Sequence, residues 1–314
     1  MNKKELRILY LGTPDISASV LEKLIEEGYN IIGVVSQPDK EVGRKHILTA
    51  TPVKVIALNH NIKVFQPLKI KEIIEEIKKI EPDILLTMAY GQLIPDSILN
   101  LPKIKALNLH GSLLPKYRGA SPIQASLLNG DDETGVTLME MVHEMDAGNM
   151  FYKKVVKIDK KDNFDTLKNK ISLAAFEAFN EGIEPIINAD YKGEVQDPTL
   201  ATFTKKISEE DEIISFEDSA KNIVNKIRAL TSDPGAYFIY KNEKIKVFDA
   251  DIISGSNLIP GKIKSYDKNG LFIETQEGII SILNLQKPGK KPINIKDFYN
   301  GNRTYFEINE IIKW

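Results

Sequence analysis

The feature that most constrains the fold is an alternation of short apolar runs with amphipathic segments in the first half of the chain. Four runs have the length and composition of buried strands: residues 7–12, 31–35, 83–88 and 106–110. Segments with helical spacing lie between them, over residues 13–28, 53–60 and 70–80. Strands that alternate with helices predict an α/β fold with a doubly wound, Rossmann-like parallel sheet. Ligands of such sheets bind beyond the carboxyl ends of the strands.

The first turn of this pattern is Gly12-Thr13-Pro14-Asp15. Thr13 suits the cap of the next helix, Pro14 its first position and Asp15 the positive end of its dipole. A dinucleotide fingerprint needs three glycines in G-x-G-x-x-G spacing, and only Gly12 is present. The segment therefore predicts a tight strand-to-helix turn rather than a dinucleotide site.

The length of 314 residues indicates two domains, since about 100–200 residues per domain is usual. We expect a catalytic domain over residues 1–189, a polar linker over 190–204 and a second domain over 205–314. Short β-rich segments separated by glycine-containing turns characterise the second domain, over residues 237–240, 244–248, 261–265, 271–274 and 279–285. This pattern predicts a small β-barrel of the OB-fold type.

Composition excludes several classes of protein. Hydrophobic residues make up 42% and charged residues 27%, which is typical of a packed globular chain. Cysteine is absent, which excludes disulfides, thiolate metal sites and a cysteine nucleophile; with four histidines and no H-E-x-x-H, we predict no metal. The apolar start of the chain is short and no run approaches the ~18 residues of a membrane span. We therefore predict a cytoplasmic protein with no membrane partner.

Three polar residues carry the most chemical information. Asn108 and His110 lie two positions apart at the end of an apolar run, so alternation along a strand places both on one face. Asp146 follows in a second glycine-bearing turn, Met145-Asp146-Ala147-Gly148. An amide can donate to a developing oxyanion, an imidazole can donate or relay a proton, and a carboxylate can orient it. This set predicts transfer of an acyl group to an amine, with the acceptor of the amine proton left open between His110 and Asp146.

Each of these residues also has a plainer interpretation. His110 alone is typical of a structural histidine, and Asp146 alone is typical of a turn. Ser112 follows His110 closely, but no G-x-S-x-G elbow surrounds it, so it is not predicted to be a nucleophile. The cluster Lys287, Lys290, Lys291 and Lys296 is typical of a solvated face, and the net charge of −2 neither indicates nor excludes a nucleic-acid partner.

The order of short motifs along the chain resembles the folate-dependent formyltransferases. The motifs that carry this resemblance are Asn108-x-His110-Gly111-Ser112-Leu113-Leu114-Pro115, Arg118-Gly119, Pro122-Ile123-Gln124, Thr134-Gly135-Val136-Thr137 and Asp146-x-Gly148. A wider set is similar to the methionyl-tRNA formyltransferases: Gly12-Thr13-Pro14-Asp15, Gln37-Pro38-Asp39, Gly43-Arg44, Phe65-Gln66-Pro67, Ala89-Tyr90-Gly91, Pro234-Gly235-Ala236 and Pro288-Gly289-Lys290-Lys291-Pro292.

The resemblance implies transfer of the formyl group of 10-formyltetrahydrofolate to the α-amino group of methionyl initiator tRNA. It implies that Asn108, His110 and Asp146 are catalytic. It also assigns a folate-binding segment, made of Ser112, Leu113, Leu114 and Pro115. Arg44 and Lys45 are expected to contact the acceptor stem, and Lys287, Lys290 and Lys291 the RNA backbone. Folate is a co-substrate in this scheme, no metal is needed, and a monomer is the default.

The match has departures and leaves two alternatives open. His46 and Ile47 stand where the family usually carries basic residues, and Asn149 stands where an acidic residue is common. The same chemistry would serve an amino sugar or glycinamide ribonucleotide as acceptor, although those enzymes lack the second domain or the basic loop. A non-catalytic RNA-binding module is the alternative from another class, and turnover separates it from an enzyme.

Overall fold

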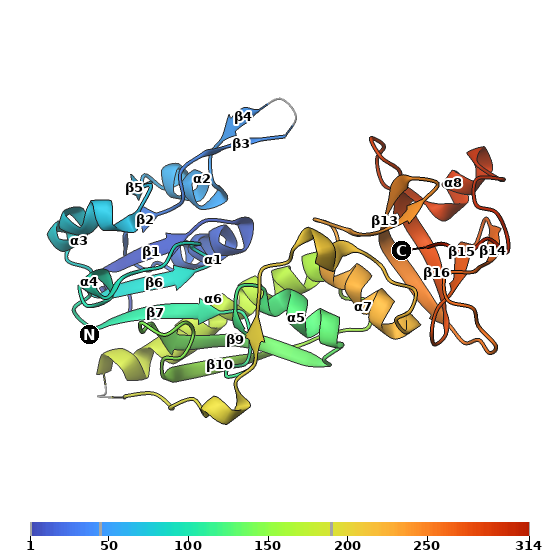
Figure 1. The fold of residues 1–314 in the computed structure, drawn as a ribbon. Coiled ribbons are helices and arrows are strands. Elements are labelled where there is room, and N and C mark those ends of the chain that lie inside the picture. Colours follow the sequence, from blue (N-terminus) through green and yellow to red (C-terminus); the bar gives the residue numbers. More distant parts are fainter. Residues whose placement is uncertain (1, 44–45, 189–190, 314) are drawn as a thin grey trace. The chain divides into compact units, whose positions relative to one another are not determined.

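The chain divides into two compact units (Figure 1), and the computed structural model describes residues 2–43, 46–188 and 191–313. The first unit comprises Met1–Gly119, Glu133–Lys157 and Lys168–Thr204. The second comprises Ala120–Asp132, Ile158–Leu167 and Lys205–Trp314. The second unit is therefore discontinuous in sequence, because two segments from the middle of the chain belong to it together with the carboxyl-terminal part.

A seven-stranded sheet forms the centre of the first unit, in the order β10-β9-β7-β6-β1-β2-β5. Its strands are β1 (Ile8–Gly12), β2 (Ile31–Val35), β5 (Val64–Phe65), β6 (Ile84–Met88), β7 (Lys105–His110), β9 (Glu133–Glu140) and β10 (Met150–Lys157). The five strands from β5 to β7 are parallel, which confirms the α/β prediction. β9 is antiparallel to both β7 and β10, so one side of the sheet departs from the predicted parallel order.

Helices cover both faces of this sheet, as a doubly wound fold requires. They are α1 (Asp15–Glu26), α2 (Pro52–Asn59), α3 (Ile74–Ile80), α4 (Asp96–Leu99) and most of α6 (Phe164–Asn188), with a 3₁₀ turn, η1 (Ile70–Ile73), before α3. On one face, Leu9 of β1 shares a core with residues of α3 and α4. On the other, Tyr10 lies 2.8 Å from the Ser17 hydroxyl of α1. α6 packs beside α1, since Lys168 forms an ion pair with Asp15.

The predicted cap of α1 is wrong. Pro14 occupies the capping position and makes no side-chain cap, whereas the Thr13 hydroxyl donates to the carbonyl oxygen of Tyr90 at 2.8 Å. Thr13 therefore joins the loop after β1 to the loop after β6, both at the carboxyl ends of parallel strands. Asp15 does lie in the first turn of the helix, as predicted.

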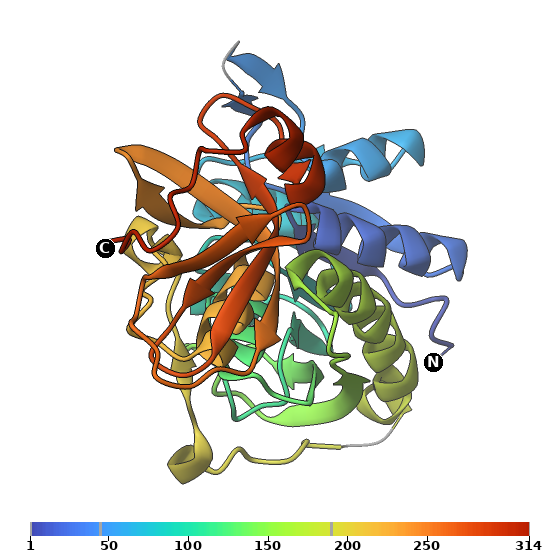
Figure 2. The same cartoon turned by 90° about the vertical axis from the view of Figure 1, so that its right-hand side faces the viewer.

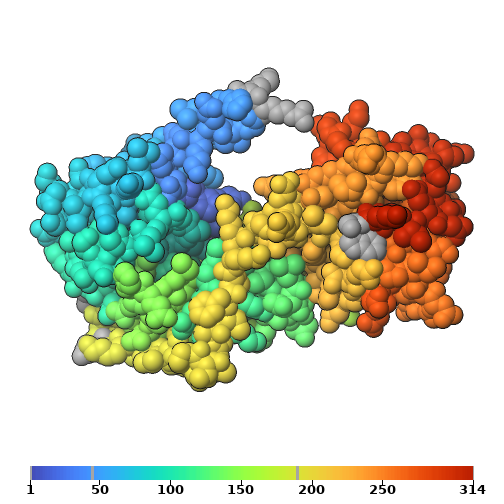
Figure 3. Space-filling model, viewed as in Figure 1, coloured from blue at the N-terminus to red at the C-terminus, as the bar shows by residue number. Residues whose placement is uncertain are grey.

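A hairpin of β3 (Lys40–Val42) and β4 (Ile47–Thr49) stands out from the first unit (Figure 3). Its apolar side chains are uncovered: Val42, Ile47 and Leu48 are 56%, 60% and 68% exposed. The predicted acceptor-stem residues Arg44 and Lys45 belong to the tip of this hairpin in sequence but lie outside the described residues.

The second unit contains an antiparallel sheet in the order β12-β13-β16-β15-β14, with β17 paired to β16. Its strands, drawn in orange and red in Figure 2, are β12 (Ala236–Tyr240), β13 (Glu243–Ile253), β14 (Ile263–Asp267), β15 (Gly270–Glu274), β16 (Ile279–Gln286) and β17 (Ile293–Asn294). The helices α5 (Pro122–Asn129), α7 (Ala220–Leu230) and α8 (Ile295–Gly301) belong to this unit, with a 3₁₀ turn, η3 (Glu209–Glu212). The prediction of a β-rich second domain is confirmed; within the described residues, β12 and β14 are not neighbours in the sheet.

The segment after α6, expected as a linker, is tied into the first unit. Glu194 forms a two-way backbone pair with Met150 at the start of β10, and a 3₁₀ turn, η2 (Pro198–Leu200), follows. β11 (Phe203–Thr204) then pairs in parallel with β8 (Arg118–Gly119). Figure 1 shows this segment in yellow.

No helix in the described part of the chain is long and apolar enough to cross a membrane. The longest helix, α6, has 25 residues but carries charged side chains along its length.

Candidate active site

Asn108 and His110 lie at the carboxyl end of β7, on the same side of the strand. Asn108 pairs with Thr87 of β6, and its Oδ1 accepts a hydrogen bond from the Thr87 hydroxyl at 2.8 Å. This bond orients the carboxamide, and the described residues offer Nδ2 no acceptor. The amide N–H groups of Asn108 are therefore available to an oxygen of a ligand.

His110 is held from both sides of its ring. The residue is 5% exposed, and Nε2 lies 2.8 Å from the carbonyl oxygen of Tyr117. A carbonyl only accepts hydrogen bonds, so Nε2 carries a proton and donates it. Nδ1 faces Oδ2 of Asp146 at 3.5 Å. The backbone of Tyr117 thus selects the tautomer and presents Nδ1 to the carboxylate.

Asp146 lies in the turn between β9 and β10 with a φ of 51°, in the left-handed region that few non-glycine residues adopt. Its Oδ2 accepts the backbone N–H of Gly119 at 2.8 Å in addition to facing His110. Oδ1 has no hydrogen-bond partner among the residues that the structure describes, and the side chain is 15% exposed. The fold therefore brings Asp146 to His110, two positions from Asn108, and leaves one carboxylate oxygen open.

Several supporting groups of this site were not predicted from the sequence. Gly119 and Tyr117 act through their backbones, while Gln196 donates to the carbonyl oxygens of Asp146 and Gly148, at 2.8 Å each. The motif Arg118-Gly119 could have indicated the backbone contacts of Tyr117 and Gly119. Gln196 carried no such signal, because it sits in a polar segment without periodicity.

The predicted folate-binding segment follows His110 directly and is pinned by Thr137 of β9. The Thr137 hydroxyl donates to the carbonyl oxygen of Ser112 at 2.7 Å and accepts the N–H of Leu114 at 3.1 Å. The Ser112 side chain is fully buried and donates to the carbonyl oxygen of Lys116. Leu114 is buried as well, whereas Leu113 and Pro115 remain partly exposed. A ligand at this segment would meet those two side chains and the backbone, not the Ser112 hydroxyl.

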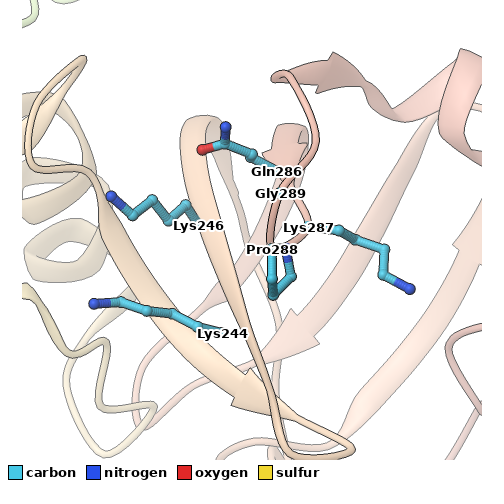
Figure 4. A pocket seen from close by; sticks show the side chains of 6 residues that line it. All are labelled: Lys244, Lys246, Gln286, Lys287, Pro288 and Gly289. Atoms are coloured by element: carbon cyan, nitrogen blue, oxygen red, sulfur yellow. The ribbon is translucent and has the colours of Figure 1, made fainter. Parts of the chain in front are cut away.

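The predicted basic cluster lies at the end of β16, beside a surface hollow in the second unit (Figure 4). Six residues line that hollow: Lys244, Lys246, Gln286, Lys287, Pro288 and Gly289. Figure 4 shows the side chains of Lys244 and Lys246 extending to one side and that of Lys287 to the other. Lys290 and Lys291 are exposed and have no ion pair within the described residues. The cluster thus contains two exposed lysines without an ion pair in the described residues, Lys290 and Lys291, and one lysine with an ion pair, Lys287.

Among the predicted RNA contacts that the structure describes, Lys287 is the most engaged. Its Nζ lies 2.9 Å from Oε2 of Glu243 and 4.2 Å from the ring centre of Tyr305. Hydrogen bonds from Tyr305 and Lys287 lower the pKa of Glu243, so this carboxylate stays charged beside the lysine. Lys287 therefore has a structural partner that a phosphate would have to displace.

Two of the residues that depart from the family pattern have polar partners in the structure. The side chain of His46 contacts Glu41 of the same hairpin. The side-chain amide of Asn149 donates to the carbonyl oxygen of Lys192. No group of three or more potential ligands that could hold a metal ion occurs in the described residues.

Comparison with protein families matches nearly the whole chain. Residues 6–183 match the formyl transferase family, and residues 206–303 match the formyl transferase C-terminal domain. A methionyl-tRNA formyltransferase from Lactobacillus johnsonii is 42% identical over 308 residues, which cover 97% of this chain and 98% of the relative. One from Malacoplasma penetrans is 41% identical and covers 95% of this chain and 94% of its own length.

Solved structures share the fold at lower identity. A sugar 3N-formyl transferase, WlaRD, solved in the presence of dTDP and 5-N-formyl-THF, has a TM-score of 0.67 and 24% identity, covering 91% of this chain and 99% of its own. HypX from Aquifex aeolicus, solved in complex with tetrahydrofolic acid, has a TM-score of 0.66 and 17% identity, covering 98% of this chain and 51% of its own.

Proposed function

This chain belongs to the formyl transferase family, and we propose that it transfers the formyl group of 10-formyltetrahydrofolate to the α-amino group of methionyl initiator tRNA. The product is formylmethionyl-tRNA, which serves translation initiation. The observation that carries this proposal is the His110–Asp146 contact beside Asn108 at the carboxyl end of β7. Full-length relatives named methionyl-tRNA formyltransferase support the choice of acceptor.

The reaction begins when the neutral amine attacks the formyl carbon. An N–C bond forms, and the formyl oxygen becomes an oxyanion. Asn108 donates from Nδ2 to this oxygen, because Thr87 already occupies its Oδ1. A donor of this kind contributes about 2.7–4 kcal/mol to the transition state. The oxyanion then collapses, and the bond from the formyl carbon to N10 of the folate breaks.

One proton must leave the amine and one must reach N10. Oδ1 of Asp146 is the open acceptor of the site, since Oδ2 is held by Gly119 and faces His110. Asp146 accepts the amine proton at Oδ1 and returns it to the departing N10, so the carboxylate is regenerated. His110 orients this carboxylate and balances its charge when Nδ1 is protonated. The site moves the proton without a metal ion.

The folate lies along residues 112–115 in this scheme. Thr137 fixes the backbone there, and Leu113 packs so closely on Gly135 that a Cβ on that glycine would come within 2.6 Å of it. The segment is therefore a rigid edge next to His110. A rigid edge suits a flat ring system whose reactive nitrogen must meet the amine in one orientation.

The tRNA contacts are proposed for both units. Arg44 and Lys45, at the tip of the β3–β4 hairpin in sequence, contact the acceptor stem. Lys290 and Lys291 contact backbone phosphates, and Lys287 contributes less because Glu243 holds it. Phosphate contacts of this type give salt-dependent affinity and position the RNA. Because its substrate is a tRNA, the chain is proposed to act in the cytoplasm. A monomer is proposed as the default oligomeric state.

The test is formyl transfer from 10-formyltetrahydrofolate to three acceptors: methionyl initiator tRNA, methionyl elongator tRNA and a free amino sugar. Preference for the initiator, lost in His110→Ala, is the expected result. Transfer only to the amino sugar would keep the chemistry and overturn the acceptor. No transfer, together with salt-sensitive RNA binding, would replace the enzyme by a binding module.

A further inference from the structure

We propose that Gln196 and Arg118 are positioning residues that hold Asp146 in its catalytic conformation. This inference rests on the proposed formyl transfer. It assigns a role in that reaction to Gln196, which follows α6 in the sequence, and to Arg118 of β8. Neither side chain is a candidate to touch the substrate. Both are covered by protein: Gln196 is 5% exposed and Arg118 is 4% exposed.

The carboxamide of Gln196 bridges two backbone carbonyl groups of the turn that carries Asp146. Its Nε2 donates to the carbonyl oxygen of Asp146 and to that of Gly148, each at 2.8 Å. These two carbonyls flank Ala147, so one amide group clamps the turn from one side. Both hydrogens of the amide are used, and the turn cannot rotate without breaking a buried hydrogen bond.

Arg118 fixes the clamp from the other side. Its Nε and Nη2 donate to Oε1 of Gln196 at 3.0 and 2.9 Å, a fork that leaves the amide only one orientation. Nη1 lies 3.5 Å from Oε1 of Glu144, two residues before Asp146. The guanidinium therefore reaches the same turn by a second route.

Asp146 needs such support because its backbone is strained. A non-glycine residue in the left-handed region costs about 1–3 kcal/mol and persists only where the surroundings over-determine it. With a φ of 51°, Asp146 directs Oδ2 to both the N–H of Gly119 and Nδ1 of His110. Relaxation of the turn would withdraw the carboxylate from the histidine.

The same short segment also anchors Gly119. β11 pairs with β8, and Thr202 accepts the N–H of Arg118 at its carbonyl oxygen, at 2.8 Å. Gly119 has a φ of 112° and no room for a Cβ, which would lie 2.2 Å from the carbonyl oxygen of Thr204. The segment over 194–204 therefore positions both partners of the Oδ2 bond, the turn and the amide that binds it.

The sharpest variant is Gln196→Glu. It keeps an acceptor for Arg118 as an ion pair, but it replaces the donor to the turn by a second oxygen. We expect kcat to fall about 10- to 100-fold, since a misplacement of about 1 Å costs roughly 10²-fold. KM for both substrates is expected to stay within about 3-fold, because neither binding surface is touched. The matched control is Gln276→Glu, which makes the same chemical change at an exposed glutamine of the second unit and is expected to leave kcat unchanged.

Two further readouts separate positioning from general destabilisation. In an Asp146→Ala background, Gln196→Glu is expected to change residual turnover by less than about 2-fold, since residues that act through one another are not additive. The imidazole ¹H–¹⁵N signals of His110 are expected to shift in Gln196→Glu while those of His60 and His143 do not. Equal losses of kcat in both backgrounds, or unchanged His110 signals, overturn the proposal. The NMR result stands even if the wild-type chain transfers no formyl group, so the two proposals fail separately.

Discussion

Charged side chains are used differently in the two units. In the first unit, Arg118 is 4% exposed and the side chain of Asp146 is 15% exposed, and each contacts several fixed partners. Lys290 and Lys291 of the second unit are exposed and have no ion pair in the described residues. Buried charges are costly unless their partners are in place, whereas exposed charges cost little and can act singly.

This difference predicts two kinds of response to mutation. In the first unit, loss of one group leaves its partners buried and misdirected, so effects should be large and concentrated in kcat. In the second unit, each lysine adds one contact in high dielectric, so effects should be small, salt-dependent and nearly additive.

The largest effect is expected for His110→Ala. The substitution removes the group that Asp146 and Tyr117 hold between them, and we expect kcat to fall about 10²- to 10⁴-fold, because the carboxylate that transfers the proton loses the group that orients it. Single-turnover formyl transfer measures this. His143→Ala is the matched control, because that side chain is 86% exposed. Comparable losses in both variants would break the contrast between covered and exposed groups.

Asn108→Asp tests the proposed oxyanion donor with little change of shape. The carboxylate still accepts from Thr87 but has no N–H to offer, so we expect kcat to fall about 10²- to 10³-fold. Steady-state kinetics with saturating folate and tRNA measures it. A rise in KM with kcat unchanged would show that Asn108 binds the substrate rather than the transition state.

The sequence allows much of this site to be predicted. Asn108 and His110 could be found from alternation at the end of an apolar run, because strand geometry alone places them together. Asp146 needed the family resemblance, since a lone aspartate before a glycine is typical of any turn. Four of the five parallel strands, β1, β2, β6 and β7, were predicted from their apolar runs, whereas the two-residue strand β5 was not.

Other features had no local signal. Arg118 and Gln196 are 78 residues apart in the sequence. A glutamine in a segment without periodicity gives no indication that its side chain has a buried partner. The antiparallel direction of β9 had no signal in the sequence, because the residue pattern of a strand is the same for either strand direction. Thr13 was assigned to a cap because capping is the commonest use of a threonine there, but a tertiary acceptor, Tyr90, was available.

Smaller effects are expected in the 287–291 loop. We expect Lys290→Ala and Lys291→Ala each to raise KM for tRNA a few-fold without changing kcat. Each should also reduce the slope of log affinity against log salt by about 0.9 per lost phosphate contact. Lys287→Ala is the informative control, because Glu243 already holds that ammonium group. A loss in Lys287→Ala as large as in the other two would show that the ion pair opens when RNA binds.

The smallest effect concerns a carboxylate on the sheet of the second unit. Although Asp249 is exposed, desolvation by the surrounding protein, and after it the neighbouring charge of Asp251, raise the pKa of its carboxyl group. A carboxyl with a raised folded-state pKa binds its proton more readily when folded, so its ionisation lowers stability as the pH rises through that pKa. Asp249→Asn removes this penalty. We expect it to raise Tm by about 1 °C at neutral or alkaline pH, and by nothing near pH ~2, which lies well below the reference aspartate pKa of about 3.9, so that the wild-type group is protonated in both states. Scanning calorimetry at the two pH values measures the difference. An equal shift of Tm at both pH values would assign the effect of Asp249→Asn to packing rather than charge. Asp249 would then resemble the groups of the first unit, whose effects depend on fixed contacts.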